Sequence, residues 1–132
     1  MLPDIDDITR IAKEEFDALP AGVRALTGDL QISIAEWPEP EHLASVGVRH
    51  PLDLLGLFEG VGLGQHGAVA QTGMFPNRIW LYREPILAFT AEGSDSLRAV
   101  VRHVLVHEIG HHFGLSDDDM YAIDDTPDDP PR

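Results

Sequence analysis

The chain contains no cysteine, few basic residues and no long apolar run. Without cysteine, disulfide bonds are excluded. No stretch reaches the ~18 consecutive apolar residues that a membrane-spanning helix needs. The first residues, M-L-P-D-I-D-D, are acidic and lack the basic and then apolar layout of a secretory signal peptide. We therefore expect a cytoplasmic location.

Basic charge is scarce: 9 basic residues stand against 23 acidic ones, which gives a net charge of −14 at pH 7. Proteins that bind nucleic acid need a basic surface to neutralise phosphates, and anionic membranes attract the same kind of surface. The composition therefore argues against both nucleic acid and membrane as partners. Solubility is the simplest reason for the negative charge, and a preference for basic substrates is the second.

With 132 residues, of which 43% are hydrophobic, the chain has the size and composition of one domain with a real core. We place that domain at residues 1–125. Residues 126–132 are acidic and rich in proline, so we expect them to form a disordered tail. No feature of the sequence specifies an oligomeric state.

The hydrophobic pattern predicts a helix near the start of the chain and short strands after it. Apolar residues recur at helical spacing over 4–19, where Asp4 is the expected N-cap. Residues 30–37 alternate apolar and polar side chains as a half-buried strand does. Residues 78–83 form the clearest predicted strand, and 54–59 reads as a further short strand.

The most informative stretch is V-L-V-H-E-I-G-H-H-F-G-L-S-D at 104–117, which contains the motif H-E-x-x-H. Side chains four residues apart lie on the same face of an α-helix, so His107 and His111 can direct two imidazoles at one ion. Glu108 lies about 100° round the helix, where it can act as a base on water bound to the ion. Zinc suits this arrangement, because catalytic zinc sites keep one position open for water. We expect this helix to begin at Ser94 as its N-cap.

A tetrahedral zinc site needs a third protein ligand. Beyond the adjacent His112 the chain contains neither histidine nor glutamate, so a downstream ligand must be an aspartate. Asp117 completes the pattern H-E-x-x-H-x-x-G-x-x-D. Gly114 accounts for the spacing, because glycine can adopt a positive φ, end the helix and turn the chain back toward the ion. Asp118 and Asp119 are alternative ligands one and two residues further along.

The other histidines have no partner at a metal-ligand spacing. His42 and His50 fall within 38–53, a proline-containing segment expected to be loop with one helical turn, and we expect both at the surface. His66 lies in a glycine-rich connection from which it can approach the site. His112 points about 100° away from the motif and is expected to be packed or hydrogen-bonded instead of binding metal.

The motif stretch resembles the zincin metallopeptidases, in particular a small bacterial zincin-like family whose members are single short acidic domains ending in H-E-x-x-H-H-x-G-x-S/D-D. The segments L-G-L-F-E-G at 55–60 and N-R-I-W-L-Y-R-E-P-I at 77–86 also look like that family, so the resemblance covers about residues 50–121. It implies an α+β, minimal zincin-like fold with an N-terminal helix, a small twisted mixed sheet and a C-terminal active-site helix beneath it. It also implies an edge strand above the metal that pairs with an extended substrate.

The sequence therefore predicts a zinc-dependent peptidase that binds one Zn²⁺ per chain through the two motif histidines and Asp117. Glu108 is the expected general base during hydrolysis of a peptide or protein substrate. Tyr82 and Tyr121 are candidates for stabilising the transition state. His103 lies on the same helix stripe, but about 12 Å along the axis from the second motif histidine, so we expect it to support the site instead of sharing its ion.

Three alternatives compete with this prediction. The motif can be a coincidence, although Gly114 and Asp117 in register argue against that. The chain can be a metal-binding zincin-like module with little or no protease activity that acts through a protein partner, because little chain follows Asp117 to wall a deep cleft. It can also resemble small bacterial ribonucleases with the pattern H-x-x-x-H-x-x-G-x-x-H, which the acidic composition and Glu108 disfavour.

Overall fold

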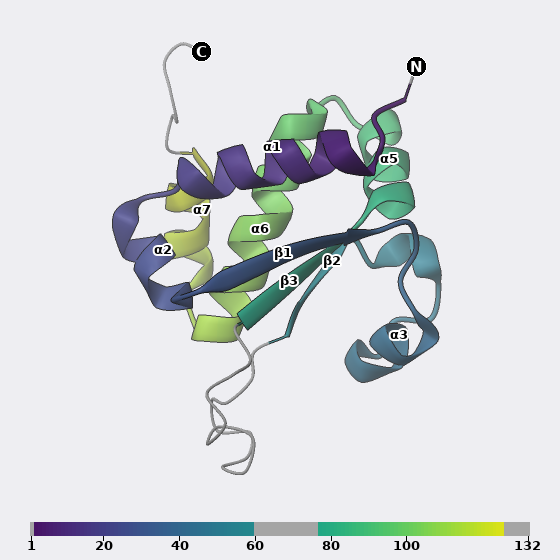
Figure 1. Cartoon of the computed structure of the whole chain (residues 1–132). Coiled ribbons are helices and arrows are strands. Elements are labelled where there is room, and N and C mark those ends of the chain that lie inside the picture. Colours follow the sequence, from purple (N-terminus) through teal and green to yellow (C-terminus); the bar gives the residue numbers. More distant parts are fainter. Residues whose placement is uncertain (1, 60–76, 126–132) are drawn as a thin grey trace.

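The computed structural model describes residues 2–59 and 77–125, which form helices around one small sheet (Figure 1). The predicted tail at 126–132 and the connection that contains His66 lie outside the described residues. No helix in the described part is long and apolar enough to cross a membrane. The elements in chain order are α1 (Ile5–Asp17), α2 (Ala21–Thr27), β1 (Leu30–Ala35), α3 (Pro40–Val46), the 3₁₀ turn η1 (Pro51–Asp53), β2 (Gly56–Glu59), β3 (Asn77–Tyr82), α5 (Arg83–Glu92), α6 (Leu97–Phe113) and α7 (Asp117–Asp125).

The start of α1 is specified locally by a capping box. The carboxylate of Asp4 accepts the Asp7 N–H at 2.8 Å, and the carboxylate of Asp7 accepts the Asp4 N–H at 3.0 Å. Ile8, Ile11 and Ala12 lie on the opposite, apolar side of the helix and are buried in the core. The predicted amphipathic helix and its N-cap are confirmed.

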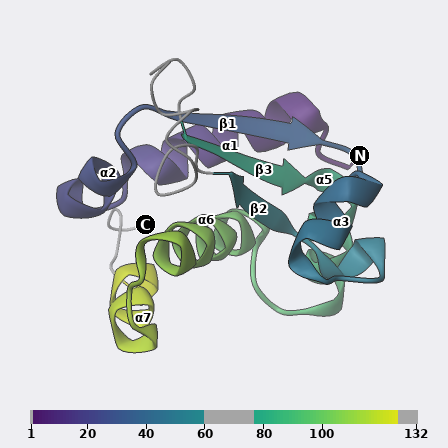
Figure 2. The ribbon, with the colours of Figure 1, turned by 90° about the horizontal axis from the view of Figure 1, so that it is seen from below.

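The sheet has three strands in the order β1-β3-β2. β1 runs parallel to β3, with Ile32 opposite Ile79, and β2 runs antiparallel to β3, with Leu57 opposite Trp80. Among the described strands β2 therefore forms one edge, and it is the strand that lies nearest to α6 (Figure 2). The small mixed sheet implied by the resemblance is confirmed.

Alternation along β3 divides its side chains between the two faces of the sheet. Ile79 and Leu81 join the main core, together with the apolar sides of α1 and α6. Trp80 and Tyr82 point to the other face, where Leu43 of α3 belongs to a second, smaller cluster. The motif helix α6 thus packs on only one face of the sheet.

Two local predictions are wrong, and one helix has no counterpart among the predicted elements. The segment after β1 contains both α3, whose first turn accommodates Pro40, and η1, so it is more helical than the predicted loop with one turn. A complete helix, α5, follows β3 directly and holds Pro85 in its first turn, where the missing N–H costs no hydrogen bond. The N-cap of α6 is Ser96, whose hydroxyl accepts the Ala99 N–H at 3.0 Å, and not Ser94. Both serines suit a cap, and only the packing of the helix selects between them.

The chain reverses between α6 and α7 at Gly114, which adopts the left-handed conformation with φ of 75°. Behind it, Leu115 N–H donates to the carbonyl of Gly110 at 2.8 Å, so the end of α6 is capped as predicted for a C-terminal glycine. The buried side chain of Met120 lies directly over Gly110, where a Cβ would collide with it. This close contact brings α7 against α6.

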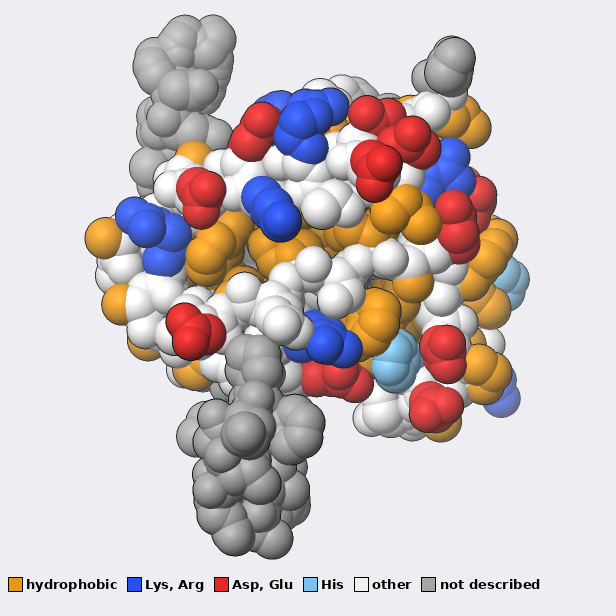
Figure 3. Space-filling view, in the orientation of Figure 1, with side chains coloured by type: hydrophobic (Ala, Val, Ile, Leu, Met, Phe, Trp, Pro, Cys, Tyr) orange, Lys and Arg blue, Asp and Glu red, His pale blue; other side chains and the backbone are white. Residues whose placement is uncertain are grey.

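Charged side chains link the outer helix α1 to the motif helix. On the face that carries α1 and β1, basic side chains stand among acidic ones (Figure 3). Arg98 of α6 pairs with Glu14 at 2.8 Å and with Glu15 at 2.9 Å, both on α1. Glu15 is almost fully buried and also lies 3.5 Å from the buried Arg102 of α6. The position of α6 is therefore held by ion pairs as well as by apolar packing.

Candidate metal centre

Helix α6 presents three histidines at four-residue intervals along one side. The ring centroids of His103 and His107 are 4.0 Å apart, and those of His107 and His111 are 5.8 Å apart. The Nε2 atom of His107 is buried and, like that of His112 outside this stripe, has no hydrogen-bond partner among the described residues. Buried polar atoms are normally satisfied, so an imidazole nitrogen left open in a stripe of histidines fits a metal ligand.

The environment of His107 favours its metal-binding form. Burial lowers the pKa of this imidazole, and the neighbouring His103 lowers it further, against the opposing effect of Asp124 and Asp117. His107 is therefore neutral at pH 7, with a nitrogen lone pair available to a cation.

Glu108 lies half-buried between α6 and the edge strand β2. Its Oε1 accepts the backbone N–H of Phe58 at 3.2 Å. Burial raises the pKa of this carboxyl, while the Phe58 amide and His111 lower it. A carboxylate with a raised pKa holds a proton more readily near neutral pH, which is the property that a general base needs.

Two cavities adjoin at Glu108. One has a volume of about 440 Å³ and is lined on α6 by His103 and His107. The other has a volume of about 340 Å³ and is lined by His111 and by His112. Gly56, the first residue of the edge strand, and Leu54 just before the strand belong to both cavities together with the glutamate. The edge of the sheet and the motif helix therefore enclose space on either side of the predicted base.

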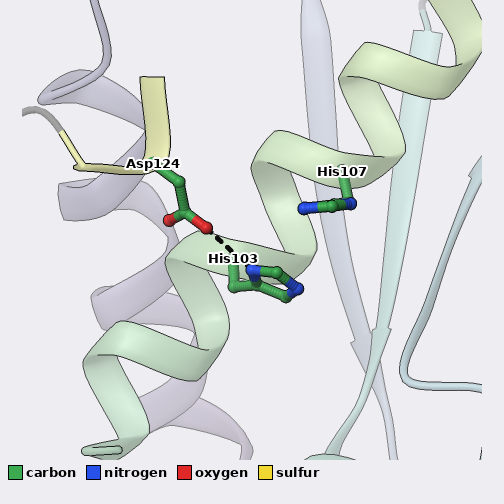
Figure 4. A group of neighbouring side chains, drawn as sticks. All are labelled: His103, His107 and Asp124. Atoms are coloured by element: carbon green, nitrogen blue, oxygen red, sulfur yellow. Dashed lines mark hydrogen bonds and ion pairs between the residues drawn. The ribbon is translucent and has the colours of Figure 1, made fainter. Parts of the chain in front are cut away.

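The structure places Asp124 beside two of these histidines. Ligand atoms of His103, His107 and Asp124 all lie within 4.8 Å of one another (Figure 4). Nδ1 of His103 is 2.7 Å from Oδ2 of Asp124. Among residues 2–59 and 77–125, these three side chains are the group whose potential ligand atoms lie close enough together to hold one ion. The group includes neither His111 nor Asp117. Sequence reasoning missed Asp124, because no local spacing connects it to the motif.

The predicted third ligand lies at the start of α7. Asp117, Asp118 and Asp119 form the first turn of that helix and are all exposed. The charge of Asp117 raises the pKa of His107, so its carboxylate lies within electrostatic range of the site. Asp119 donates its backbone N–H to the Ser116 hydroxyl at 3.0 Å, a bond that caps the helix. The choice among the three aspartates stays a prediction.

The two tyrosines proposed as transition-state stabilisers lie in different places. Tyr82 is fully buried on the sheet face away from α6, and its hydroxyl is 2.6 Å from Nδ1 of His42. Burial raises the pKa of Tyr82, and its side chain lines neither cavity. Tyr121 of α7 is exposed, with its ring centroid 6.3 Å from that of His107. The geometry therefore favours Tyr121 over Tyr82.

Two other histidines have structural contacts. His42 is largely shielded from solvent and bonds to the hydroxyl of Tyr82, so its predicted place at the surface is wrong. Its Nε2 is also 3.6 Å from the carboxylate of Glu59. The ring of His112 stacks on Phe58 at 4.1 Å, which confirms the expectation that it is packed. This stacking ties the motif helix to the edge strand.

A helix that carries H-E-x-x-H, packed beside the edge strand of a small mixed sheet, defines a zincin-type architecture. A family model described as zincin-like metallopeptidase matches residues 27–126. The chain belongs to this zincin-like metallopeptidase family, which places it among metal-dependent peptidases and makes zinc the typical metal. A comparison with curated proteins gives no match.

Proposed function

We propose that this protein is a zinc-dependent peptidase, with one Zn²⁺ bound by His107, His111 and Asp117 and with Glu108 as general base. The position of Glu108 carries the proposal. It is next in sequence to a histidine with an open buried nitrogen, it lies where two cavities adjoin, and it touches the backbone of the edge strand.

The proposed donor set suits zinc. Two neutral imidazoles and one carboxylate are a usual protein complement for catalytic zinc, which leaves a fourth position for water or substrate. When bound, zinc supplies a Lewis acid that polarises the scissile carbonyl and acidifies water. The unpartnered Nε2 of His107 supports this fit, since it is a buried acceptor that a cation would satisfy.

Glu108 is placed to move the protons of peptide hydrolysis. It takes one proton as water attacks the carbonyl carbon and gives that proton to the leaving amine, so that one peptide and one water become a carboxylic acid and an amine. The hydrogen bond from Phe58 N–H holds the carboxylate in position, and partial burial keeps its pKa high enough to retain a proton between the two steps.

An extended substrate can bind to the edge of β2 that no described strand covers. Tyr82 N–H donates to the Leu55 carbonyl at 3.0 Å, so that pair belongs to the β2–β3 hydrogen-bond ladder. In an antiparallel pair the backbone groups alternate in direction, so those of Gly56 and Phe58 point away from β3. Phe58 N–H does point that way, because it reaches Glu108 on α6. A peptide that adds to this edge through the backbone groups of Gly56, with Phe58 N–H kept on Glu108, passes the base directly, with a cavity on either side for its side chains.

Metal analysis combined with a peptide-library cleavage assay tests this function. We expect purified protein to contain about one zinc per chain, and cleavage to disappear with a chelator and return when zinc is added. A chelator already saturated with zinc is the control and should leave cleavage unchanged. Bound zinc without cleavage of any peptide would instead support the binding-module alternative. Cleavage of RNA at low salt, without cleavage of peptides, would support the nuclease alternative.

A further inference from the structure

We propose that α6 carries a second position for a divalent cation, formed by His103, His107 and Asp124. It is separate from the position proposed for peptidase zinc, but the two share His107. The second position is argued from the contacts among its own three side chains. Only its competition with the peptidase zinc rests on the proposed function.

The three side chains converge from two helices (Figure 4). His103 and His107 are one turn apart on α6, so their rings lie on the same side of the helix at 4.0 Å between centroids. Asp124 comes from α7, and the three ligand atoms lie within 4.8 Å of one another. A tetrahedral zinc with bonds of about 2.1 Å holds its ligand atoms about 3.4 Å apart. Small side-chain rotations therefore bring this group to binding distance.

Asp124 is held in place before any ion arrives. The buried guanidinium of Arg102 donates to the carbonyl of Ile123 at 2.9 Å and to that of Asp124 at 3.3 Å, which caps the end of α7. Arg102 is itself paired with Glu15 of α1 at 3.5 Å. With the backbone fixed in this way, the Asp124 carboxylate meets His103 at 2.7 Å. A ligand group that is already ordered loses little entropy when it binds a cation.

The group is open to a cation from one side. His103 and His107 line the cavity of about 440 Å³ described above, and His103 is exposed. The Nε2 of His107 has no hydrogen-bond partner among the described residues, so a cation at this position would satisfy a buried acceptor. Two imidazoles and a carboxylate favour Zn²⁺, Co²⁺ and Ni²⁺ over Mg²⁺ or Ca²⁺.

The shared histidine makes the two positions alternatives. Their centres are displaced by one helical turn, about 6 Å along the axis of α6. One imidazole nitrogen binds one ion at a time, so an ion held by His103, His107 and Asp124 deprives the neighbouring position of a ligand. A measured content of one ion per chain is then compatible with an ion bound at the second position, not by His111 and Asp117.

The two metal positions can be distinguished by measuring metal binding in variants that lack one of them. In a His111→Ala/Asp117→Ala double variant, equilibrium dialysis with Zn²⁺ and the absorption spectrum of bound Co²⁺ should still show about one ion per chain. Adding His103→Ala or Asp124→Asn to that variant should abolish the bound ion. Loss of a merely supporting hydrogen bond would lower the affinity only ~10–100-fold.

The exposed His50 supplies the matched control. His50→Ala in the same double variant should leave the ion bound, and circular dichroism checks that every variant is folded. Asp124→Asn keeps the shape of the side chain, so it guards against a folding defect from truncation.

The proposal is overturned if the His111→Ala/Asp117→Ala protein binds no more metal than a His107→Ala protein. That result would leave the proposed peptidase ligands intact. If instead His103→Ala alone removes the ion from the otherwise unaltered chain, the second position is supported as the main one. In that case the ligand set of the proposed function is wrong. Failure of the second position and failure of the proposed function therefore give different results.

Discussion

Replacing Glu108 by glutamine tests the general base with little change in shape. The glutamine Oε1 can still accept the Phe58 N–H that Glu108 Oε1 accepts at 3.2 Å, so the contact between α6 and β2 is kept. Glutamine cannot take a proton from water. Because Glu108 is not among the proposed ligands, the variant should retain about one zinc per chain.

The size of the expected loss follows from the role of the residue. General-base catalysis contributes about 10²–10⁴-fold, so kcat/KM should fall by that factor, or about 3–5 kcal/mol of transition-state stabilisation.

The same substitution should not lower the folding stability of the protein. Burial raises the pKa of Glu108 above its usual 4.5, so its contribution to stability is present below that pH and is lost as the pH rises through the raised pKa. At pH 8 the metal-free glutamine variant should therefore be at least as stable as the parent.

The assay is kcat/KM for a peptide selected from the library, measured from pH 5 to pH 9 together with the zinc content. For the parent, kcat/KM should fall as the pH drops through the raised pKa of Glu108, since only the ionised carboxylate is a base. Glu92→Gln, at an exposed carboxyl of α5, is the matched control and should behave like the parent. A Glu108→Gln protein that keeps its zinc and cleaves as fast as the parent would refute the assignment, and one that loses its zinc would make Glu108 a ligand.

Three further substitutions test the ligand, the helix contact and the helix cap. In a His103→Ala background, which lacks the second position, Asp117→Asn should weaken zinc binding more than tenfold while Asp118→Asn does not, and equal effects in dialysis would contradict the choice of ligand. Gly110→Ala should lower the stability by about 1–3 kcal/mol, because its Cβ meets the buried methionine of α7. Gly22→Ala, in open space within α2, should raise stability by about 0.5–1 kcal/mol, and thermal melts compare the two. The Asp4 backbone N–H lowers the pKa of Asp7, so the stability from this carboxylate is present above 3.8 and is lost as the pH falls. Asp7→Asn should therefore lower the melting temperature at pH 7, and the difference should shrink between about pH 5 and about pH 3.

Interactions within a few residues made much of the fold predictable. The capping box of Asp4 and Asp7, the strand β1 with its alternating sequence and the positive φ of Gly114 all depend on neighbours in the chain. The placement of His107 and Glu108 on one helix is of the same kind, because helix geometry alone sets the angle between consecutive side chains. The N-cap at Ser96 and the helix α5 escaped prediction, since their local signals were equivocal and packing decided between alternatives.

The sequence by itself determined a helix with two imidazoles one turn apart, a carboxylate beside them and a glycine that ends the helix. Only the tertiary structure decided that β2 is the edge strand beside Glu108 and that Tyr82 lies on the far face of the sheet. It alone also brought Asp124 to His103, a contact that spans 21 residues. The physical reason is range: dihedral preferences and caps act over about one turn, whereas the contact between His103 and Asp124 exists only because α7 folds back and packs against α6.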